Sequence, residues 1–293
     1  MPELPEVETV RRGLAPALEG RTLERVDIAD ARLTRPFDPV EVARELEGER
    51  VQAVDRRGKY LIVRFASGRA LLVHLRMTGS FRIGGDPDPH GRAVLELDDG
   101  TQVGYRDVRR FGTWLLLEPD EVGAYVDARV GREPLESAYR AKHLAERLAG
   151  RRAPVKAAIL DQRTVAGVGN IYADEALWRA RVHPLIPAEA LGPEEVKALH
   201  RGIRDALRMG IRRQGSTLRD YRRPDGGKGG AQHEFKVYGR GGEPCDRCGT
   251  PIEKIRVAGR GTWYCPACQS PPAAYAASSS SSRPSRSSRH SSV

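Results

Sequence analysis

All four cysteines of the chain lie close together near its C-terminal end, as Cys245-Asp-Arg-Cys248 and Cys265-Pro-Ala-Cys268. Two Cys-x2-Cys pairs at this separation are typical of a site in which four thiolates bind one zinc ion. The stretch between the pairs suits a β-hairpin but is too short to enclose a core, so metal binding would supply its folding energy. A redox pair or two disulfides are the alternatives. We predict one structural zinc ion.

The clustering of the cysteines also bears on where the protein works. Cysteines confined to one module leave no distributed disulfide framework, which indicates a reducing compartment. The opening residues, Met-Pro-Glu-Leu-Pro-Glu, lack the basic and apolar regions of a secretory signal. No apolar stretch approaches the ~18 residues that a membrane-spanning helix needs. We therefore expect a cytoplasmic protein without membrane contact.

The net charge indicates a polyanionic partner. Lys and Arg together number 49 against 39 acidic residues, which gives a formal charge of +10. Only seven of the basic residues are lysines, so 49 − 7 = 42 are arginines. Arginine forms bidentate, always-charged contacts with phosphate, which favours nucleic acid as the partner. Drift towards arginine codons and general solubility are the alternative explanation.

The sequence pattern predicts an α+β protein of about two domains. Apolar residues repeat with helical spacing over residues 3–18, and Pro5 falls in the first turn, where a missing N–H costs little. Short apolar runs then predict strands, which favours a sandwich or barrel over a βαβ sheet. These runs cover residues 23–28, 60–65, 70–75, 93–97 and 113–117.

After Pro134 the pattern becomes helical. Amphipathic segments predict helices over residues 135–148, 154–161, 171–182 and 193–213. A glycine-rich loop over residues 224–230 leads to a predicted short strand at 235–238. From Ser270 onwards the chain is rich in Ser, Pro and Arg, and we expect that tail to be disordered.

Two glycine-containing turns are candidate phosphate sites. In Thr164-Val-Ala-Gly-Val-Gly-Asn170, the last residue is placed to cap the next helix, and helix N-termini bind phosphate well. A plain connector between helices is the alternative. In the predicted hairpin, glycines on both sides of Arg260 suit a tight turn that projects one guanidinium. That guanidinium either contacts phosphate or is simply solvated.

The N-terminus is a third candidate site. Initiator methionine is normally removed before proline, which would leave Pro2 as a free secondary amine, partly neutral at physiological pH. Such an amine can attack a sugar's anomeric carbon and form an iminium. Glu3 and Glu6 are suitable as general acid and as orienting group, and Lys59 can donate a proton as arginine cannot. An ordinary helix start and a strand-edge lysine are the alternatives.

Taken together, these features resemble the formamidopyrimidine-DNA glycosylase family, bacterial base-excision enzymes for oxidised purines. The matching blocks follow in the same order from residue 2 to about residue 269, which makes the set far more specific than any single block. Besides the four cysteines, they are Pro2-Glu-Leu-Pro-Glu-Val-Glu8, Arg57-Gly-Lys-Tyr60, His74-Leu-Arg-Met-Thr-Gly79, Asp107-Val-Arg-Arg-Phe-Gly112, Gly167-Val-Gly-Asn-Ile-Tyr-Ala173 and Val237-Tyr-Gly-Arg240.

The resemblance implies a DNA-repair glycosylase and lyase that acts on damaged double-stranded DNA, as a monomer, in the bacterial cytoplasm. It implies an N-terminal helix with a β-sandwich catalytic domain over residues 1–132 and a helix-two-turn-helix domain over 133–234. A zinc finger over 235–269 and the disordered tail over 270–293 would complete the chain. DNA would lie in the cleft between the two larger domains.

The resemblance also implies roles for individual residues. Pro2 would be the nucleophile, Glu3 the general acid, Lys59 the proton donor for β-elimination and Arg260 the zinc-finger residue for phosphate binding and δ-elimination. The implied DNA contacts are His90, Arg109, Arg152 and Asn170. Met77, Arg109 and Phe111 would enter the duplex and fill the gap left by the extruded nucleotide.

The chain departs from the family pattern at two positions. Ala231 stands where the loop that covers the everted base usually carries Phe, and Arg92 stands where a second histidine is common. Two other functions compete with the first. A related glycosylase for oxidised pyrimidines usually has Gly in place of Leu4. A catalytically silent DNA-damage binding protein would not need Pro2 and Lys59.

Overall fold

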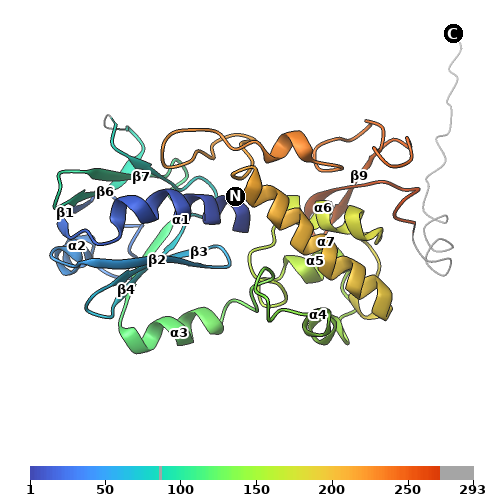
Figure 1. The fold of residues 1–293 in the computed structure, drawn as a ribbon, viewed down its shortest axis with the longest axis horizontal. Helices are drawn as coiled ribbons and strands as arrows, with labels where there is room; N and C mark the ends of the chain where they lie inside the picture. Colours follow the sequence, from blue (N-terminus) through green and yellow to red (C-terminus); the bar gives the residue numbers. More distant parts are fainter. Residues whose placement is uncertain (86–87, 271–293) are drawn as a thin grey trace, which may run out of the picture.

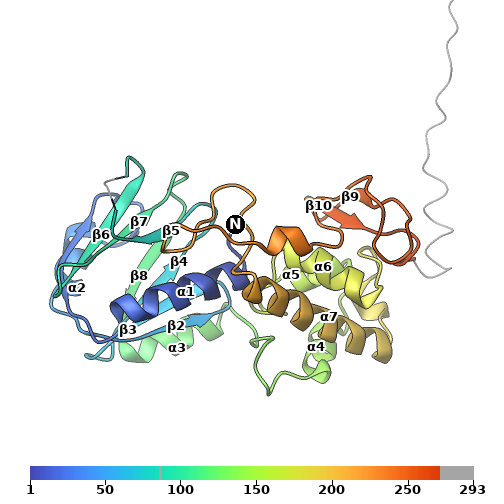
Figure 2. The same cartoon turned by 45° about the horizontal axis from the view of Figure 1, so that its top comes forward.

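The computed structural model describes residues 1–85 and 88–270. The tail predicted to be disordered falls, apart from Ser270, outside the described residues. A strand-rich part and a helical part lie side by side, and a two-stranded hairpin sits on the helical part (Figures 1 and 2). The predicted α+β fold is confirmed.

The strand-rich part is a sandwich of two four-stranded antiparallel sheets with order β1-β6-β7-β5 and β2-β3-β4-β8. Side chains from both sheets form one core together with the inner face of α1. The strands are β1 (Leu23–Ile28), β2 (Val51–Arg57), β3 (Tyr60–Phe65), β4 (Ala70–His74), β5 (Ser80–Ile83), β6 (Gly91–Leu97), β7 (Gln102–Arg106) and β8 (Thr113–Leu117).

Three helices accompany the sandwich. Helix α1 (Leu4–Leu18) has Pro5 in its first turn, as predicted, and contacts both sheets through β2 and β5. Helix α2 (Pro39–Leu46) packs on β1, and α3 (Pro119–Asp127) covers β4. The sequence patterns did not reveal α2 and α3, because each is short and begins at a proline that reads equally well as a turn.

The helical part contains α4 (Ala141–Leu148), α5 (Val155–Leu160), α6 (Asn170–Ala180) and α7 (Pro193–Arg212), with 3-10 turns at Ala188–Ala190 and Ala231–Glu234. The predicted helix over residues 135–148 is wrong in its first half, since α4 begins only at Ala141. Arg204 donates hydrogen bonds to the carbonyls of Pro134 and Glu136, at 2.6 and 3.0 Å. Arg204 of α7 therefore binds both carbonyls, and the Glu136 carbonyl also accepts the amide of Tyr139 in an isolated turn, at 3.2 Å.

The predicted strand over residues 235–238 is also wrong. One oxygen of the buried Glu175 carboxylate accepts hydrogen bonds from the consecutive amides of Lys236, Val237 and Tyr238, at 2.8, 2.9 and 3.1 Å. Successive amides of a strand point in opposite directions, so three that converge on one oxygen require a curled backbone. The true hairpin follows it as β9 (Glu253–Val257) and β10 (Arg260–Tyr264).

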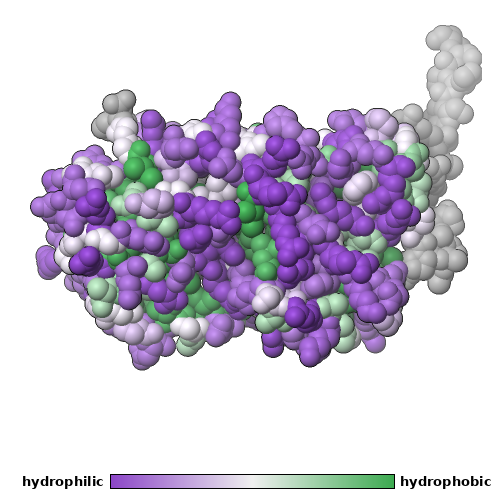
Figure 3. All heavy atoms as spheres, viewed as in Figure 1, coloured by the Kyte–Doolittle hydropathy of each residue, from purple (hydrophilic) through white to green (hydrophobic). Residues whose placement is uncertain are grey.

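A segment of the helical part returns to the sandwich. After α7 the chain passes over α1 towards β5 (Figure 1), where the carbonyl of Pro224 accepts a hydrogen bond from the amide of Ile83 at 3.0 Å. The same proline packs against Gly13 of α1. Hydrophilic residues cover most of the face shown in Figure 3, and apolar residues show mainly over the sandwich and in the seam between the two parts. None of the helices formed by the described residues has the length and apolar character needed to cross a membrane.

Candidate active site

A cavity of about 420 Å³ opens where the sandwich and the helical part meet. The start of the chain and the loops after β4 and β7 form one wall. The start of α6 and the segment after α7 form the other. Its lining includes Pro2, Glu6, Met77, Arg109, Ser216 and Tyr238.

The first residues of the chain are fixed against α6. Pro2 and Glu3 are buried just before α1. The Glu3 carboxylate accepts hydrogen bonds from the amides of Gly169, Ile171 and Tyr172, at 2.9, 2.9 and 3.2 Å. A helix leaves its first N–H groups without internal partners and carries partial positive charge there, so a buried carboxylate is well accommodated. Glu3 thus joins the start of the chain to the helical part.

The predicted capping role of Asn170 is wrong. Gly169 occupies the cap position, and Asn170 is the first residue of α6. Because Glu3 already takes the free amides of this helix, the Asn170 side chain is available for another partner. Its amide group donates a hydrogen bond to the carbonyl of Gly261 at 3.0 Å. Asn170 therefore ties α6 to the hairpin.

Glu6 lies behind the first residues, fully enclosed. Its carboxylate accepts hydrogen bonds from the amide of Glu3 at 2.9 Å, the amide of Ser216 at 2.8 Å and the hydroxyl of Tyr172 at 2.8 Å. Burial, and after it the negative charge of Glu3, raise the pKa of Glu6 to about 7. Glu6 therefore exchanges a proton in the neutral range, next to Pro2 and Glu3.

Two cations face these carboxylates from different parts of the chain. Lys59, only 5% exposed, sits in the turn between β2 and β3. Burial lowers its pKa, the charge of Glu3 opposes that shift, and the charge of Arg260 adds to it. A Cβ atom placed on Gly58, next to Lys59, would lie 3.5 Å from the Gly167 amide nitrogen. Asn170 bonds to the carbonyl of Gly261, next to Arg260, so both cations adjoin the start of α6. The structure thus brings together Pro2, Glu3, Lys59 and Arg260, the residues predicted to be catalytic.

The hairpin is held in place by a buried ion pair. The Nζ of Lys156, on α5, lies 2.7 Å from a carboxylate oxygen of Asp174, on α6, and both side chains are fully buried. Lys156 also donates to the carbonyl of Gly261 and the hydroxyl of Thr262, at 3.0 and 2.8 Å. These two residues directly follow Arg260, so the pair fixes where that guanidinium leaves the hairpin.

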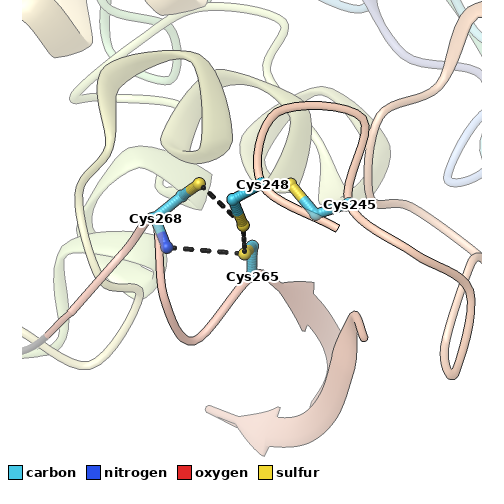
Figure 4. A group of neighbouring side chains, drawn as sticks. All are labelled: Cys245, Cys248, Cys265 and Cys268. Carbon is cyan, nitrogen blue, oxygen red and sulfur yellow. Dashed lines mark hydrogen bonds between the residues drawn. The ribbon is translucent and has the colours of Figure 1, made fainter. Parts of the chain in front are cut away.

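The four cysteines meet at the far end of the hairpin (Figure 4). Their sulfur atoms all lie within 4.8 Å of one another, and the Sγ atoms of Cys248 and Cys265 are 3.4 Å apart. Four thiolates about 2.3 Å from one ion would be spaced in this way, so the donor set fits tetrahedral zinc. The indole of Trp178 donates to the Cys245 sulfur at 3.3 Å, which seats the site on α6. The protein therefore carries one structural zinc ion held by Cys245, Cys248, Cys265 and Cys268.

The predicted duplex-entering residues lie together at the opening of the cavity. Met77 and Arg109 line it, and the Arg109 guanidinium lies 4.7 Å from the centre of the Phe111 ring. Met77 is 39% exposed and Phe111 51% exposed. Large apolar side chains left in solvent beside a cavity are typical of a binding surface.

The other three predicted DNA contacts, His90, Arg152 and Asn170, are not among the residues that line the cavity. His90 directly precedes β6, and its carbonyl accepts a hydrogen bond from the amide of Asp107 at 3.0 Å. Arg152 lies in the loop between α4 and α5, with 93% of its side chain exposed and its nearest carboxylate, Glu189, 3.9 Å away.

The sequence analysis did not identify Lys156, Asp174 and Glu175 as residues that shape the site. All three are buried charged side chains. Two consecutive acids inside a helix that is otherwise apolar were the available signal, because buried carboxylates require partners. Only the fold shows that those partners are α5, the hairpin and the segment after Phe235.

Comparisons with known proteins agree with this geometry. The formamidopyrimidine-DNA glycosylase N-terminal domain matches residues 1–114, the H2TH domain of the same enzymes matches 130–222, and the zinc finger found in FPG and IleRS matches 242–271. Formamidopyrimidine-DNA glycosylase of Symbiobacterium thermophilum is 47% identical over 290 residues, which cover 98% of this chain and 95% of that one.

Two solved structures are similar as well, both of Lactococcus lactis FPG. One is the complex of an FPG mutant with a Fapy-dG containing DNA, at a TM-score of 0.87. The other is the complex with an abasic site containing DNA, at a TM-score of 0.86. Each is 38% identical to this chain and covers 92% of this chain and 100% of that one.

The Lys156–Asp174 pair provides a test of how the hairpin is held. Lys156→Met leaves the Asp174 carboxylate buried without its cation, and we expect a loss of about 3–5 kcal/mol in the free energy of unfolding. The double variant Lys156→Met, Asp174→Leu removes both charges, so its free energy of unfolding should fall by clearly less than that of Lys156→Met. Chemical denaturation of the zinc-loaded protein measures both. A double variant as unstable as the single one would contradict the assignment.

Proposed function

The chain belongs to the formamidopyrimidine-DNA glycosylase family, and on that premise we propose that it is a bifunctional DNA glycosylase and abasic-site lyase of base-excision repair. It removes oxidised purines such as 8-oxoguanine and formamidopyrimidines from double-stranded DNA. It then cuts the strand at the resulting abasic sugar by β,δ-elimination. The observation that carries this proposal is the convergence of Pro2, Glu3, Lys59 and Arg260 on one site from three parts of the chain.

Pro2 is the nucleophile in this proposal, once Met1 has been removed. Its nitrogen forms a bond to the anomeric carbon of deoxyribose while the bond from that carbon to the base breaks. Burial lowers the pKa of the amino group of Met1. Pro2 is more deeply enclosed than Met1. The burial of Pro2 would desolvate a free amine there, which favours the neutral, nucleophilic form.

Glu3 and Glu6 handle protons beside Pro2. A carboxylate offers about four lone-pair sites, and three of those of Glu3 accept amides of α6, so about one is left to face the sugar. At that site Glu3 can take up the proton that the Pro2 nitrogen gives up on bonding to the sugar and pass it to the ring oxygen, and so act as general acid when the ring opens. Glu6, whose pKa is raised to about 7, holds or releases a proton next to the amine. Its hydrogen bond to the Glu3 amide orients the chain start.

Lys59 and Arg260 serve the later steps. The iminium draws electrons from the sugar, so water can take a proton from the adjacent carbon while the bond to the 3′ oxygen breaks. Lys59 donates a proton to the departing 3′ oxygen in this β-elimination. A second elimination breaks the bond to the 5′ oxygen. Arg260 binds the phosphate there and stabilises its leaving charge. Zinc takes no part in these steps and supplies the folding energy of the hairpin that carries Arg260.

The target base must leave the duplex before it can react, which costs a few kcal/mol and least for a damaged pair. Met77 and Phe111 replace lost stacking, and Arg109 hydrogen-bonds the orphaned base. His90, Arg152, the Asn170 amide and the exposed arginines bind the backbone without reading sequence.

These roles divide the chain into a catalytic domain at 1–132, a DNA-binding helical domain at 133–234 and the zinc hairpin at 235–269. A monomer suffices, because both walls of the cavity come from one chain. Four zinc-binding thiolates suit the reducing bacterial cytoplasm.

Borohydride trapping on a duplex with 8-oxoguanine opposite cytosine tests the proposed chemistry. We expect reduction of the iminium to leave a covalent protein–DNA adduct. A matched protein with one residue added before Pro2 should still bind the duplex but give no adduct. Trapping only on oxidised pyrimidines would instead indicate the related pyrimidine enzyme, and duplex binding without any trapping would indicate a silent damage-binding protein.

Zinc removal tests the role of the hairpin. Without the metal the hairpin has too little core to stay folded, so Arg260 loses its position and duplex affinity should fall at least about tenfold. Fluorescence anisotropy with labelled duplex, before and after chelation with metal loss verified by mass spectrometry, measures this. Restoration by added zinc is the control. Unchanged affinity in the metal-free protein would refute the role.

A further inference from the structure

The two loops that carry Met77, Arg109 and Phe111 are connected by buried groups beneath them. One loop joins β4 to β5 and the other joins β7 to β8. Strands β5 and β7 are neighbours, with Ser80 paired to Arg106, so the loops leave the sheet side by side.

Asp107 bonds to both loops. It is 1% exposed, and one carboxylate oxygen accepts a hydrogen bond from the hydroxyl of Thr78 while the other accepts the amide of Gly112 at 2.7 Å. The oxygen of Thr78 in turn accepts the amide of Arg109 at 3.0 Å. A continuous chain of hydrogen bonds therefore runs from the residue after Met77 to both ends of the 109–112 segment.

Arg110 is turned away from its two neighbours. Its backbone has a left-handed φ of 57°. Its guanidinium makes two hydrogen bonds to the buried carboxylate of Asp30, at 2.6 and 2.7 Å. This bidentate ion pair fixes the middle of the loop to the turn after β1, with charge-assisted bonds that are among the stronger ones in proteins. Arg109 and Phe111, on either side, are thereby left facing outwards.

The ring of Tyr105 fills the space under both loops. A Cβ atom placed on Gly79 would lie 2.4 Å from the Tyr105 hydroxyl oxygen, and one placed on Gly112 would lie 1.9 Å from it. Neither glycine can therefore carry a side chain with the ring in place, and at Gly79 the Leu75 carbonyl, 2.5 Å from such a Cβ, blocks one as well. Tyr105 is buried, packs against Phe81 and Trp114 of the sandwich core, and so ties the loops to a rigid support.

We propose that Thr78, Asp107, Asp30 and Tyr105 are positioning residues that join the two loops into one preformed wedge. Met77, Arg109 and Phe111 then enter the duplex together, without first having to be ordered. This inference rests on the proposed function, since it assigns these groups to base extrusion. Groups held in place before binding do not lose conformational freedom at that step, so preorganisation lowers the barrier to extrusion.

Thr78→Val and Thr78→Ser form the test pair. Valine has nearly the same shape but removes the bonds to Asp107 and to the Arg109 amide, whereas serine keeps both. We expect Thr78→Val to lower single-turnover excision of 8-oxoguanine from duplex by about tenfold or more, the order expected when a bonded hydroxyl is lost from a buried carboxylate. The single-turnover excision rate of Thr78→Ser should stay within about threefold of that of the original protein.

Cleavage of a single-stranded abasic site is the control reaction, because it needs the nucleophile and Lys59 but no base extrusion. Thr78→Val should leave its rate nearly unchanged. Fluorescence quenching of a 2-aminopurine base placed opposite the lesion reports insertion of the wedge. This quenching should be slower in Thr78→Val than in the original protein, and unchanged in Thr78→Ser. An equal loss on both substrates, or equal behaviour of the two variants, would overturn the proposal.

Amide hydrogen exchange separates this proposal from the proposed function. Thr78→Val should speed exchange at the Arg109 amide and leave the amides of β3 unchanged, even if the original protein excises no base at all. Absence of excision by the original protein would refute the proposed function. Unchanged exchange at Arg109 would refute the coupling of the loops.

Discussion

The hydrogen bonds between the Glu3 carboxylate and the first amides of α6 are the interaction on which the site depends. They place a charge from the start of the chain on the positive end of a helix whose cap residue, Gly169, lies 166 residues later. A second bond, from the Leu4 amide to the Gly167 carbonyl at 3.0 Å, runs alongside. The sandwich and the helical part are thus joined at Pro2, so the proposed nucleophile lies in the cleft because the two parts are assembled around it.

The other proposed catalytic groups are arranged relative to the same helix. Lys59 comes from the sandwich, and the residue before it, Gly58, lies close to the backbone of Gly167 just before α6. Arg260 reaches the site because Asn170 and the Lys156–Asp174 pair fasten the hairpin to α5 and α6. The zinc ion then supplies the folding energy that so small a hairpin lacks. Helix α6 is therefore the common support for charges that come from three separate regions of the sequence.

Features that the sequence predicted well are local. The cysteine spacing, the helix at residues 3–18 and five strands of the sandwich (β1, β3, β4, β6 and β8) each follow from side chains near one another in the chain. Strands β2, β5 and β7 were not predicted. Errors arose where a distant partner decides the local structure. Glu175 curls the segment from Lys236 to Tyr238, Arg204 holds residues 134–136 out of a helix, and Glu3 displaces Asn170 as the cap. These partners lie far away in the sequence, so a local pattern cannot reveal them. The buried Lys156–Asp174 ion pair was not predicted for the same reason.

The central claim is that Glu3 fixes the chain start on α6, and hydrogen exchange in Glu3→Ala tests it most directly. Without the carboxylate, the amides of Ile171 and Tyr172 lose their acceptor and should exchange at least about tenfold faster, while amides in the middle of α7 keep their original rates. If the amides of residues 171 and 172 exchange at the same rate in both proteins, the start of the chain is held by something else and the account of the site is wrong.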